Sequence, residues 1–494
     1  MIRKTFLLPL FLLLQISLFA GGHFKWTPKA KAAYQSVIDL RLGLAEKQIA
    51  VLRRDEPDNL MVHHLENYVD FFRVFINEDK AEFERLEANK DRRLDAIKNG
   101  DSLSPYYLYL QADIRLQWAL ARLKFEEYAT AFFETNKAFK LLDENTQKHP
   151  HFMPNRKDLG ILHAMIGTIP DSYKWLVESL TSMEGTIAQG QRELKEVVQY
   201  ARRHEFTYDT ETYVFYAYLN LHLGNDEESA WKLINQSNLQ PDKSPLAAFI
   251  TANIAMRTDR NDEAIRILEN RPRGAEFPVF PYLDYMLGSA KLNRLDADAD
   301  VYFKKYLRDF KGRNFIKDTY RRLAWHDLIH GNRSGYAHYM QKVKTQGYTI
   351  VGGDESALAE AEKGELPDKD LLKARVLFDG GYYQKAYDVL IKKTVAGYES
   401  QRYSLEYNYR MGRVLHRMKK YPEALIYYDK TIETGRNSEW YFACRSALEK
   451  GRIYEVKGDK AAAKEAYRTC LDIKPAEYKT GLHQQAKAGL SRVR

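Results

Sequence analysis

Residues 444–475 read CRSALEKGRIYEVKGDKAAAKEAYRTCLDIKP, and they predict two antiparallel helices joined by a tight turn. Gly451 and Ala463 are small at the places where the two helices cross closely. Gly458 can take the left-handed conformation that ends the first helix, and Pro475 stops the second. Such a hairpin cannot bury its apolar face alone, so neighbouring hairpins must stack on it. The stretch therefore predicts an all-α solenoid.

The order of small, aromatic and helix-breaking residues in this stretch resembles the tetratricopeptide repeat, a 34-residue helix–turn–helix unit. Two units with the same order precede it. Their small residues, Ala374 and Gly412, stand 38 and 39 residues before the next equivalent position, so the connecting turns are longer than the family norm. The resemblance implies a right-handed superhelix of antiparallel helical hairpins, with a concave groove that binds a peptide or protein.

The repeats follow the family pattern closely in one part of the chain and loosely in another, which divides the chain into regions. Clear repeats and a closing helix after Lys479 occupy residues 370–494, and degenerate repeats occupy residues 206–349. Residues 350–369 are rich in helix-breaking glycine and predict a flexible break between the two sets.

Residues 23–205 predict an atypical N-terminal helical domain. Apolar periodicity indicates helices over residues 30–53, 60–76 and 81–98, followed by a long hairpin over 105–145. Residues 153–200 are interrupted by glycines that favour close helix approach. This segment resembles one in the inclusion-body-clearance family of helical repeat proteins, and that resemblance implies architecture only.

The N-terminus has the order of a signal peptide, predicted over residues 1–22. A basic start at residues 2–4 precedes an apolar run over 5–20 and a small-residue cleavage site that ends at Gly22. The mature protein is therefore expected in an exported compartment, most plausibly a bacterial periplasm. An uncleaved segment that anchors the protein in the inner membrane is the alternative. Any other contact with a membrane is expected to be peripheral.

The charge of the chain favours anionic partners. Lys and Arg total 76 against 67 Asp and Glu, a formal net charge of +9, which suits acidic protein segments, glycans or lipids. Nucleic acid is not expected, because export removes the chain from it and no basic run exceeds three residues.

Few residues suggest chemistry. His326 and His330 have the i, i+4 spacing of a zinc site, but Asp327 stands where a zincin has glutamate, and no third ligand follows. We expect no metal, cofactor or catalytic group. Cys444 and Cys470 are interpreted as small buried side chains, because Cys470 is expected about one helical turn short of Cys444. A disulfide between them stays open.

An arginine column is the candidate binding site. Arg375, Arg413 and Arg452 each follow the small residue of a clear repeat. In the tetratricopeptide family this position faces the groove, and the resemblance places Tyr409 and His416 there too. We therefore predict a non-catalytic exported scaffold that binds an acidic peptide or protein partner, with envelope assembly as the expected setting. The alternatives are a protein that binds a glycan or envelope polymer, and a metal-dependent hydrolase that uses the two histidines.

Overall fold

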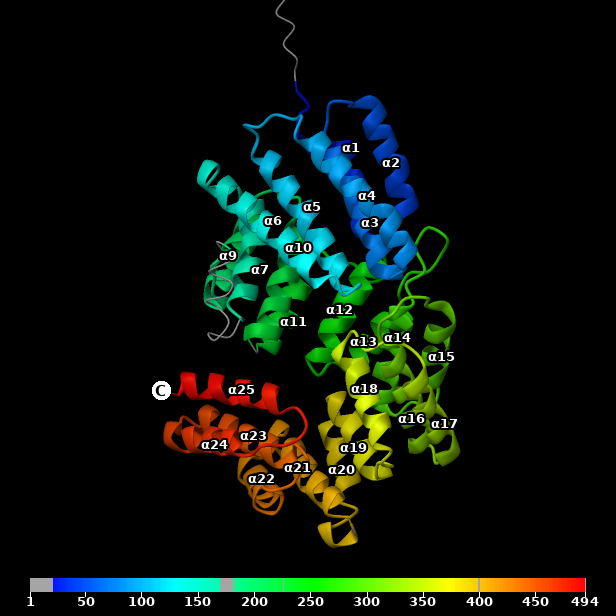
Figure 1. The fold of residues 1–494 in the computed structure, drawn as a ribbon, viewed down its shortest axis with the longest axis vertical. Helices are drawn as coiled ribbons and strands as arrows, with labels where there is room; N and C mark the ends of the chain where they lie inside the picture. The colour runs from blue at the N-terminus through cyan, green and yellow to red at the C-terminus, as the bar shows by residue number, and fades with distance from the viewer. Residues whose placement is uncertain (1–20, 169–180, 182, 225, 399, 494) are drawn as a thin grey trace, which may run out of the picture.

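The structure is a computed structural model and describes residues 21–168, 181, 183–224, 226–398 and 400–493. Helices make up the regular secondary structure of these residues, apart from two isolated β-bridges that join residues 22 and 23 to residues 100 and 59. Consecutive helices pair as antiparallel hairpins that stack into a solenoid (Figure 1), so the predicted fold class is confirmed. The predicted signal peptide lies, up to residue 20, outside the described residues.

The first half of the solenoid comprises α1 (Pro28–Ile38), α2 (Leu42–Asp55), α3 (Met61–Asn77), α4 (Lys80–Ile97), α5 (Pro105–Leu123), α6 (Tyr128–Lys148), α7 (Met153–Ile166), α9 (Ile187–Ala201), α10 (Asp209–Leu219), the π-helical turn η1 (Asn220–Gly224) and α11 (Glu227–Gln236). The second half comprises α12 (Pro245–Arg257), α13 (Asn261–Glu269), α14 (Tyr282–Arg294), α15 (Ala299–Asp309), α16 (Ile316–Ile329), α17 (Arg333–Thr345), α18 (Gly352–Lys363), α19 (Lys369–Asp379), α20 (Tyr383–Leu390), the 3₁₀ turn η2 (Val395–Gly397), α21 (Gln401–Arg417), α22 (Tyr421–Gly435), α23 (Phe442–Val456), α24 (Lys460–Asp472) and α25 (Lys479–Arg492).

Contacts between hairpins far apart in the sequence tie one turn of the superhelix to another. Glu78 accepts hydrogen bonds from the side chain of Asn314, at 2.7 Å, and from its backbone N–H. Arg417 at the end of α21 pairs with Glu227 at 3.0 Å and with Asp259. In Figure 1 the chain accordingly descends through α14–α17 and returns, so that α25 lies below α11. We call these two sets of contacts the inter-turn ties.

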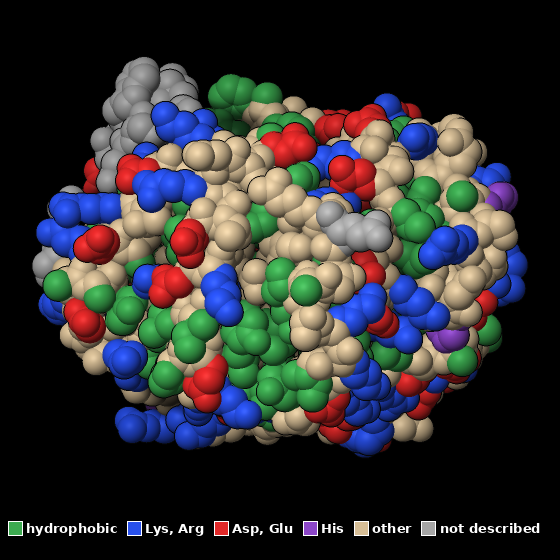
Figure 2. Space-filling model, turned by 90° about the horizontal axis from the view of Figure 1, so that it is seen from below, with side chains coloured by type: hydrophobic (Ala, Val, Ile, Leu, Met, Phe, Trp, Pro, Cys, Tyr) green, Lys and Arg blue, Asp and Glu red, His purple; other side chains and the backbone are tan. Residues whose placement is uncertain are grey.

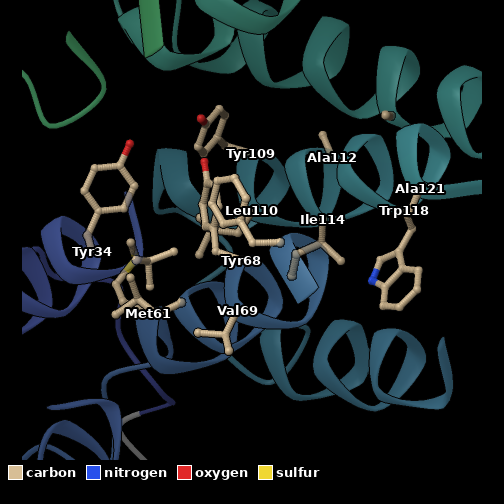
Figure 3. Packing of buried hydrophobic residues seen from close by; sticks show 14 of the residues in the cluster. Tyr34, Met61, Tyr68, Val69, Tyr109, Leu110, Ala112, Ile114, Trp118 and Ala121 are labelled. Atoms are coloured by element: carbon tan, nitrogen blue, oxygen red, sulfur yellow. The ribbon is translucent and has the colours of Figure 1, made fainter. Parts of the chain in front are cut away.

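The core of the first half lies where α1, α3 and α5 meet (Figure 3). The rings of Tyr34 and Tyr68 have centroids 5.8 Å apart and lie nearly perpendicular, and Tyr109 is fully buried beside them. Trp118 is only 1% exposed and donates from its indole nitrogen to Asn67. Edge-to-face pairs add about 0.5–1.5 kcal/mol each beyond burial, so aromatic packing holds these three helices together.

The helix predicted over residues 30–53 is two helices, α1 and α2, and that boundary prediction is wrong. Leu40 lies between them with a left-handed backbone, at φ 57°, and its side chain is fully buried. A left-handed residue costs about 1–2 kcal/mol, whereas burying a leucine side chain gains about 1.5–3 kcal/mol. Burial of the Leu40 side chain therefore offsets the backbone strain. The chain turns at Leu40 although neither glycine nor proline stands between α1 and α2.

Residues 350–369, predicted as a flexible break, contain the packed helix α18, which corrects that prediction. Ala357 and Ala361 of α18 are buried. Asp354, also on α18, accepts hydrogen bonds from the backbone N–H groups of Phe315, at 2.6 Å, and Asp318, at 2.9 Å. These N–H groups belong to the start of α16 and have no partner within that helix. A side chain distant in sequence therefore caps α16 and holds the segment in place.

Replacing Asp354 with asparagine should flatten the pH dependence of stability. Burial raises the pKa of this carboxyl to about 6, above the unfolded value of about 3.9. Its contribution is therefore fully present below about pH 4 and is lost as the pH rises through about 6. We expect the wild type to gain up to about 3 kcal/mol relative to Asp354→Asn when the pH falls from about 7 to about 4. Urea unfolding at both pH values measures the difference, and parallel pH profiles would contradict it.

Glycines bring α7 and α9 into backbone contact. A Cβ atom built on Gly190 would lie 2.2 Å from the carbonyl oxygen of Gly160 and 2.9 Å from the backbone nitrogen of Ala164. Neither contact can be relieved by turning a side chain. The close helix approach predicted for residues 153–200 is thus present at this crossing.

Gly190→Ala should destabilise the α7–α9 pair by about 1–3 kcal/mol or more, because the added methyl overpacks a backbone contact. Gly43→Ala is the matched control, since Gly43 lies in α2 and a Cβ there meets nothing within 4 Å. It should be neutral, or stabilising by about 0.5–1 kcal/mol through reduced backbone entropy. Hydrogen exchange in α7 and α2 reads out each change locally, and equal effects would refute the packing argument.

Candidate functional site

The concave side of the last repeats is built from their first helices, α19, α21 and α23, with α25 following in the same position. Close packing of each hairpin fixes their rotation. A Cβ on Gly412 would lie 2.6 Å from the ring of Tyr428, and one on Gly451 would lie 2.4 Å from Tyr467. At each glycine, the ring of a tyrosine on the second helix of the hairpin therefore packs directly against the backbone of the first helix. The next residue is turned about 100° around the helix, away from that contact.

These four inner helices enclose a pocket of about 440 Å³, which we call the arginine pocket. Four arginines line it against one carboxylate, and four aromatic residues complete much of the wall. The lining arginines are Arg375, Arg410, Arg413 and Arg445, the carboxylate is Asp379, and the aromatic residues are Phe378, Tyr409, Tyr441 and Tyr478. Basic and aromatic groups therefore dominate the pocket.

The structure brings three of the five predicted site residues to the pocket wall, namely Arg375, Tyr409 and Arg413. Arg452 does not line it. Its guanidinium donates to Glu449, at 3.0 Å, and to Gln485, at 2.8 Å, and Gln485 is itself a lining residue.

His416 does not line the pocket either. It lies beyond the pocket along α21, 3.3 Å from the hydroxyl of Tyr428 and 3.7 Å from the carboxylate of Glu449. Burial lowers the pKa of His416, so the imidazole is neutral at neutral pH. The positive charge of this region therefore comes from arginine.

Sequence reasoning missed two of the lining arginines, Arg410 and Arg445. Their spacing carried a signal, because Arg410 precedes Arg413 by three residues and Arg445 precedes Arg452 by seven. Residues three, four or seven apart share one face of a helix. Tyr441 and Tyr478, which stand just before α23 and α25, gave no such signal because they lie outside the periodic segments.

Most arginines of the region already have a carboxylate partner. Arg410 donates to Glu406 at 2.8 Å, and Arg445 donates to Glu449 at 2.8 Å. Burial by itself would raise the pKa of Glu449, but the guanidinium groups of Arg452, Arg445 and Arg413 hold it well below its usual range. Glu449 is thus a permanent anion beneath the pocket.

Arg375 is held more loosely than these two. Its guanidinium lies 3.7 Å from a carboxylate oxygen of Glu360 and 4.4 Å from the ring centroid of Trp325. The ring fixes the orientation of the guanidinium through a cation–π contact, while the distance to Glu360 exceeds that of a hydrogen bond. Arg375 therefore keeps donors for a further acceptor.

Arg413 differs from its neighbours in having no carboxylate in direct ion-pair contact among the described residues. Its Nη1 donates to the hydroxyl of Tyr409 at 2.8 Å, and its guanidinium lies 4.4 Å from the ring centroid of Phe378. The two aromatic residues hold the guanidinium in place, and the charge of Glu449 acts on it only at longer range. Arg413 is therefore positioned to receive an anionic group that enters the pocket.

His326 and His330 are engaged with backbone carbonyl groups, one in the preceding hairpin and one in their own helix. Nε2 of His326 lies 3.0 Å from the carbonyl oxygen of Ala297, and Nδ1 of His330 lies 2.8 Å from the carbonyl oxygen of His326. Each of these nitrogens therefore carries its proton and donates it. Across the described residues, no three His, Cys, Asp or Glu side chains are grouped so that they could hold a metal ion.

The helices of the described residues include none with the length and apolar character needed to cross a membrane.

Comparison with known proteins agrees with the hairpin architecture. Residues 445–477 match the family model described as tetratricopeptide repeat. No curated protein is significantly similar to the chain in sequence. One similar solved structure is a monomeric mutant of IFIT1 with the capped RNA m7Gppp-AAAA (12% identity, 94% of this chain, 80% of that chain, TM-score 0.29). Another is the APC/C hetero-tetramer Cut9-Hcn1 (11% identity, 93% of this chain, 95% of that chain, TM-score 0.27). At such scores, neither says what this chain binds.

Proposed function

We propose that this chain, a tetratricopeptide-repeat protein, is a non-catalytic scaffold that holds an acidic segment of a protein partner in the arginine pocket. The observation that carries the proposal is Arg413, a guanidinium fixed by Tyr409 and Phe378 that has no carboxylate in direct ion-pair contact among the described residues. Arginine donors form a planar fork that matches a carboxylate or phosphate, so a side chain or terminus of this kind can bind two donors at once.

The charges of the pocket lining support an anionic partner. Figure 2 shows one end of the molecule, where Lys and Arg side chains are interspersed with Asp and Glu and form no single basic face. Along the pocket lining, by contrast, arginines outnumber carboxylates four to one, although two of the four, Arg410 and Arg445, pair with carboxylates outside the lining. The electrostatic field of exposed charges is largely screened beyond about 10 Å at moderate salt. The arginines of a partly enclosed pocket, by contrast, attract an anionic group that enters it. An anionic partner is thus expected to be recognised at the pocket rather than over the wider surface.

A second candidate is an anionic glycan or envelope polymer. Tyr478 is 56% exposed and lies on the pocket wall with Tyr441, their ring centroids 5.1 Å apart. Aromatic rings of this kind can stack on sugar faces, and the arginines would take carboxylate or phosphate groups on the polymer. If a polymer is the ligand, Tyr478→Ala should weaken binding at least as much as Arg413→Ala. If a protein segment is the ligand, the arginine should matter more.

The proposed setting is an exported compartment. The basic start, the apolar run and the small residues of the first 22 positions support it. We expect cleavage near Gly22, so the mass of the protein recovered from its native cells should lack the first 20 or so residues, as the signal-peptide pattern predicts. An intact Met1 would instead make this segment an anchor.

Site-directed crosslinking tests the scaffold proposal. Gly481 lines the pocket and its Cβ position is open, so a photoreactive phenylalanine analogue fits there. In native cells we expect it to crosslink to a discrete protein, and the crosslink should disappear when Arg413→Glu is added. The same analogue at the exposed Arg468, on the outer helix α24, is the control position. A crosslink from Gly481 that survives Arg413→Glu, or that appears equally from Arg468, would refute the proposal.

A further inference from the structure

The two cysteines of the chain lie side by side inside the last hairpin. The Sγ atoms of Cys444 on α23 and Cys470 on α24 are 3.5 Å apart, and both side chains are fully buried. The offset of one turn that the sequence suggested is wrong. Counted from the turn at Gly458, the cysteines are 14 and 12 residues away (458 − 444 and 470 − 458). The difference of two residues is only about 3 Å along the helix axis.

Chance does not readily explain this pairing. The chain of 494 residues has two cysteines in total. A fully buried residue touches roughly 6–12 others, so a cysteine placed at random would touch the other about one time in fifty. The sulfur atoms also face each other across the helix pair with no other side chain between them at 3.5 Å. A bond between them requires an approach to about 2.05 Å, which is a small shift for two cysteine side chains.

The pair also lies in the last hairpin that the structure describes. This hairpin packs against a complete hairpin, α21 and α22, on one side and against the single helix α25 on the other, so it is expected to open more readily than a hairpin between two others. After the hairpin of α23 and α24, the described chain continues only with α25. The same hairpin contributes Arg445 to the arginine pocket, and Leu482 of α25 is a lining residue whose carbonyl oxygen lies 3.9 Å from Sγ of Cys470. Opening of this end would dismantle one wall of the pocket.

We propose that Cys444 and Cys470 are a disulfide-forming pair that locks the terminal hairpin and thereby holds one wall of the arginine pocket. The reaction needs an oxidant of the disulfide class, either a small-molecule disulfide or an oxidised dithiol protein. One cysteine thiolate attacks the disulfide, forms a mixed disulfide and releases one thiol. The second cysteine thiolate then attacks the sulfur of the first and releases the other thiol. The two cysteine protons pass to water or to the released thiolates.

The environment of the closed hairpin makes the two thiols unequal. A hydrogen bond from Cys470, followed by the nearby charge of Arg445, lowers the pKa of the Cys444 thiol, although burial opposes the shift. The same hydrogen bond raises the pKa of Cys470. In the closed hairpin Cys444 is therefore the more readily ionised thiol, while in the open hairpin either cysteine can attack first. Since both sulfurs are buried, the bond forms while the last hairpin is open, during folding or local unfolding, and then closes beneath α25.

Refolding in a redox buffer tests whether the bond forms. The full chain is unfolded with reductant, refolded in a buffer of oxidised and reduced glutathione, and alkylated in denaturant before its intact mass is measured. We expect a product that lacks two hydrogens and carries no alkyl group. Cys444→Ala and Cys470→Ala should each retain one alkylatable thiol or a glutathione adduct. A refolded wild type with two free thiols, or with two glutathione adducts, would overturn the proposal.

Hydrogen exchange tests the lock independently of any partner. In the oxidised protein, α23 and α24 should exchange several-fold more slowly than in the reduced protein, with α25 following, while α19 and α20 should not change. The double variant Cys444→Ala/Cys470→Ala should exchange like the reduced wild type in both buffers, which excludes an effect of the reductant itself. If the bond forms but exchange in α23 and α24 is unchanged, the pair is not a lock. Neither result depends on the proposed scaffold function.

Discussion

Replacing Lys157 with methionine should lower the local free energy of unfolding of the first half by about 3–5 kcal/mol, the cost of leaving a buried charge unpaired. Lys157, on α7, is fully buried, and its Nζ lies 2.7 Å from Glu211 and 2.9 Å from Asp158. Glu211, on α10, also accepts the hydroxyl groups of Tyr34 and Tyr68. One carboxylate thus joins helices α1, α3, α7 and α10, and it depends on the ammonium of Lys157.

The carboxyl of Asp158 makes the loss depend on pH. Burial raises the pKa of Asp158 to about 7 even with Lys157 beside it, and Lys157 is the main group that opposes the rise. Without the lysine this pKa would rise further, so Asp158 would be protonated at neutral pH and its stability contribution would depend on pH above that range. Hydrogen exchange of the amides in α7 and α10 measures the loss.

Two further variants make the Lys157 prediction sharp. Lys140→Met changes an exposed lysine on α6 and should stay within about 0.5 kcal/mol of the wild type. Adding Glu211→Gln to Lys157→Met should recover part of the loss, because a neutral amide can remain bonded to the tyrosines without a cation. If Lys157→Met were as stable as Lys140→Met, the buried network would not join these helices as argued.

The second large effect is expected at Arg413. Arg413→Ala should weaken the acidic partner by about 1.5–3 kcal/mol, the worth of a hydrogen bond to a charged group, which is a loss of roughly ten- to a hundredfold in affinity. The partner identified by crosslinking, or an acidic peptide from it, can be titrated by calorimetry. Raised salt should weaken the wild type more than the variant, since the variant has lost one charge of the pocket.

Arg413→Lys separates the geometry of the guanidinium from its charge. An ammonium cannot make the planar fork, so lysine should restore only part of the affinity. Arg468→Ala removes an exposed arginine from the outer helix α24 and should bind as the wild type does. If Arg375→Ala and Arg413→Ala both bound the partner normally, the arginine pocket would be ordinary surface.

The last repeats could be predicted from sequence because their constraints are local. Gly412 and Gly451 are small since an outer-helix tyrosine presses on each, and the helix period then fixes the direction of Arg413. The same reasoning did not indicate that His416 lies beyond the pocket, 3.7 Å from the carboxylate of the buried Glu449 on the next helix. Such a contact forms between two helices, so the periodicity of the sequence does not reveal it.

Other parts of the chain were harder to predict because tertiary contacts decide their local structure. Leu40 takes a left-handed turn for the sake of its buried side chain, and no turn residue marks the place. Asp354 caps α16 from a different helix, about 40 residues further along the chain. Glycine-rich sequence around it suggested a break, since glycine is commonest where chains bend. In both places the deciding partner is remote in sequence.

The inter-turn ties limit how this protein can have evolved. Repeat arrays commonly gain or lose whole repeats by duplication and deletion, because each repeat contacts only its neighbours. Here Arg417 meets Glu227, and Glu78 meets Asn314, only when the number of hairpins between them brings both ends to the same side of the superhelix. One hairpin more or fewer would rotate each partner away from the other. Ancestral changes in length should therefore be confined to the loops, while the repeat number between the ties is inherited unchanged.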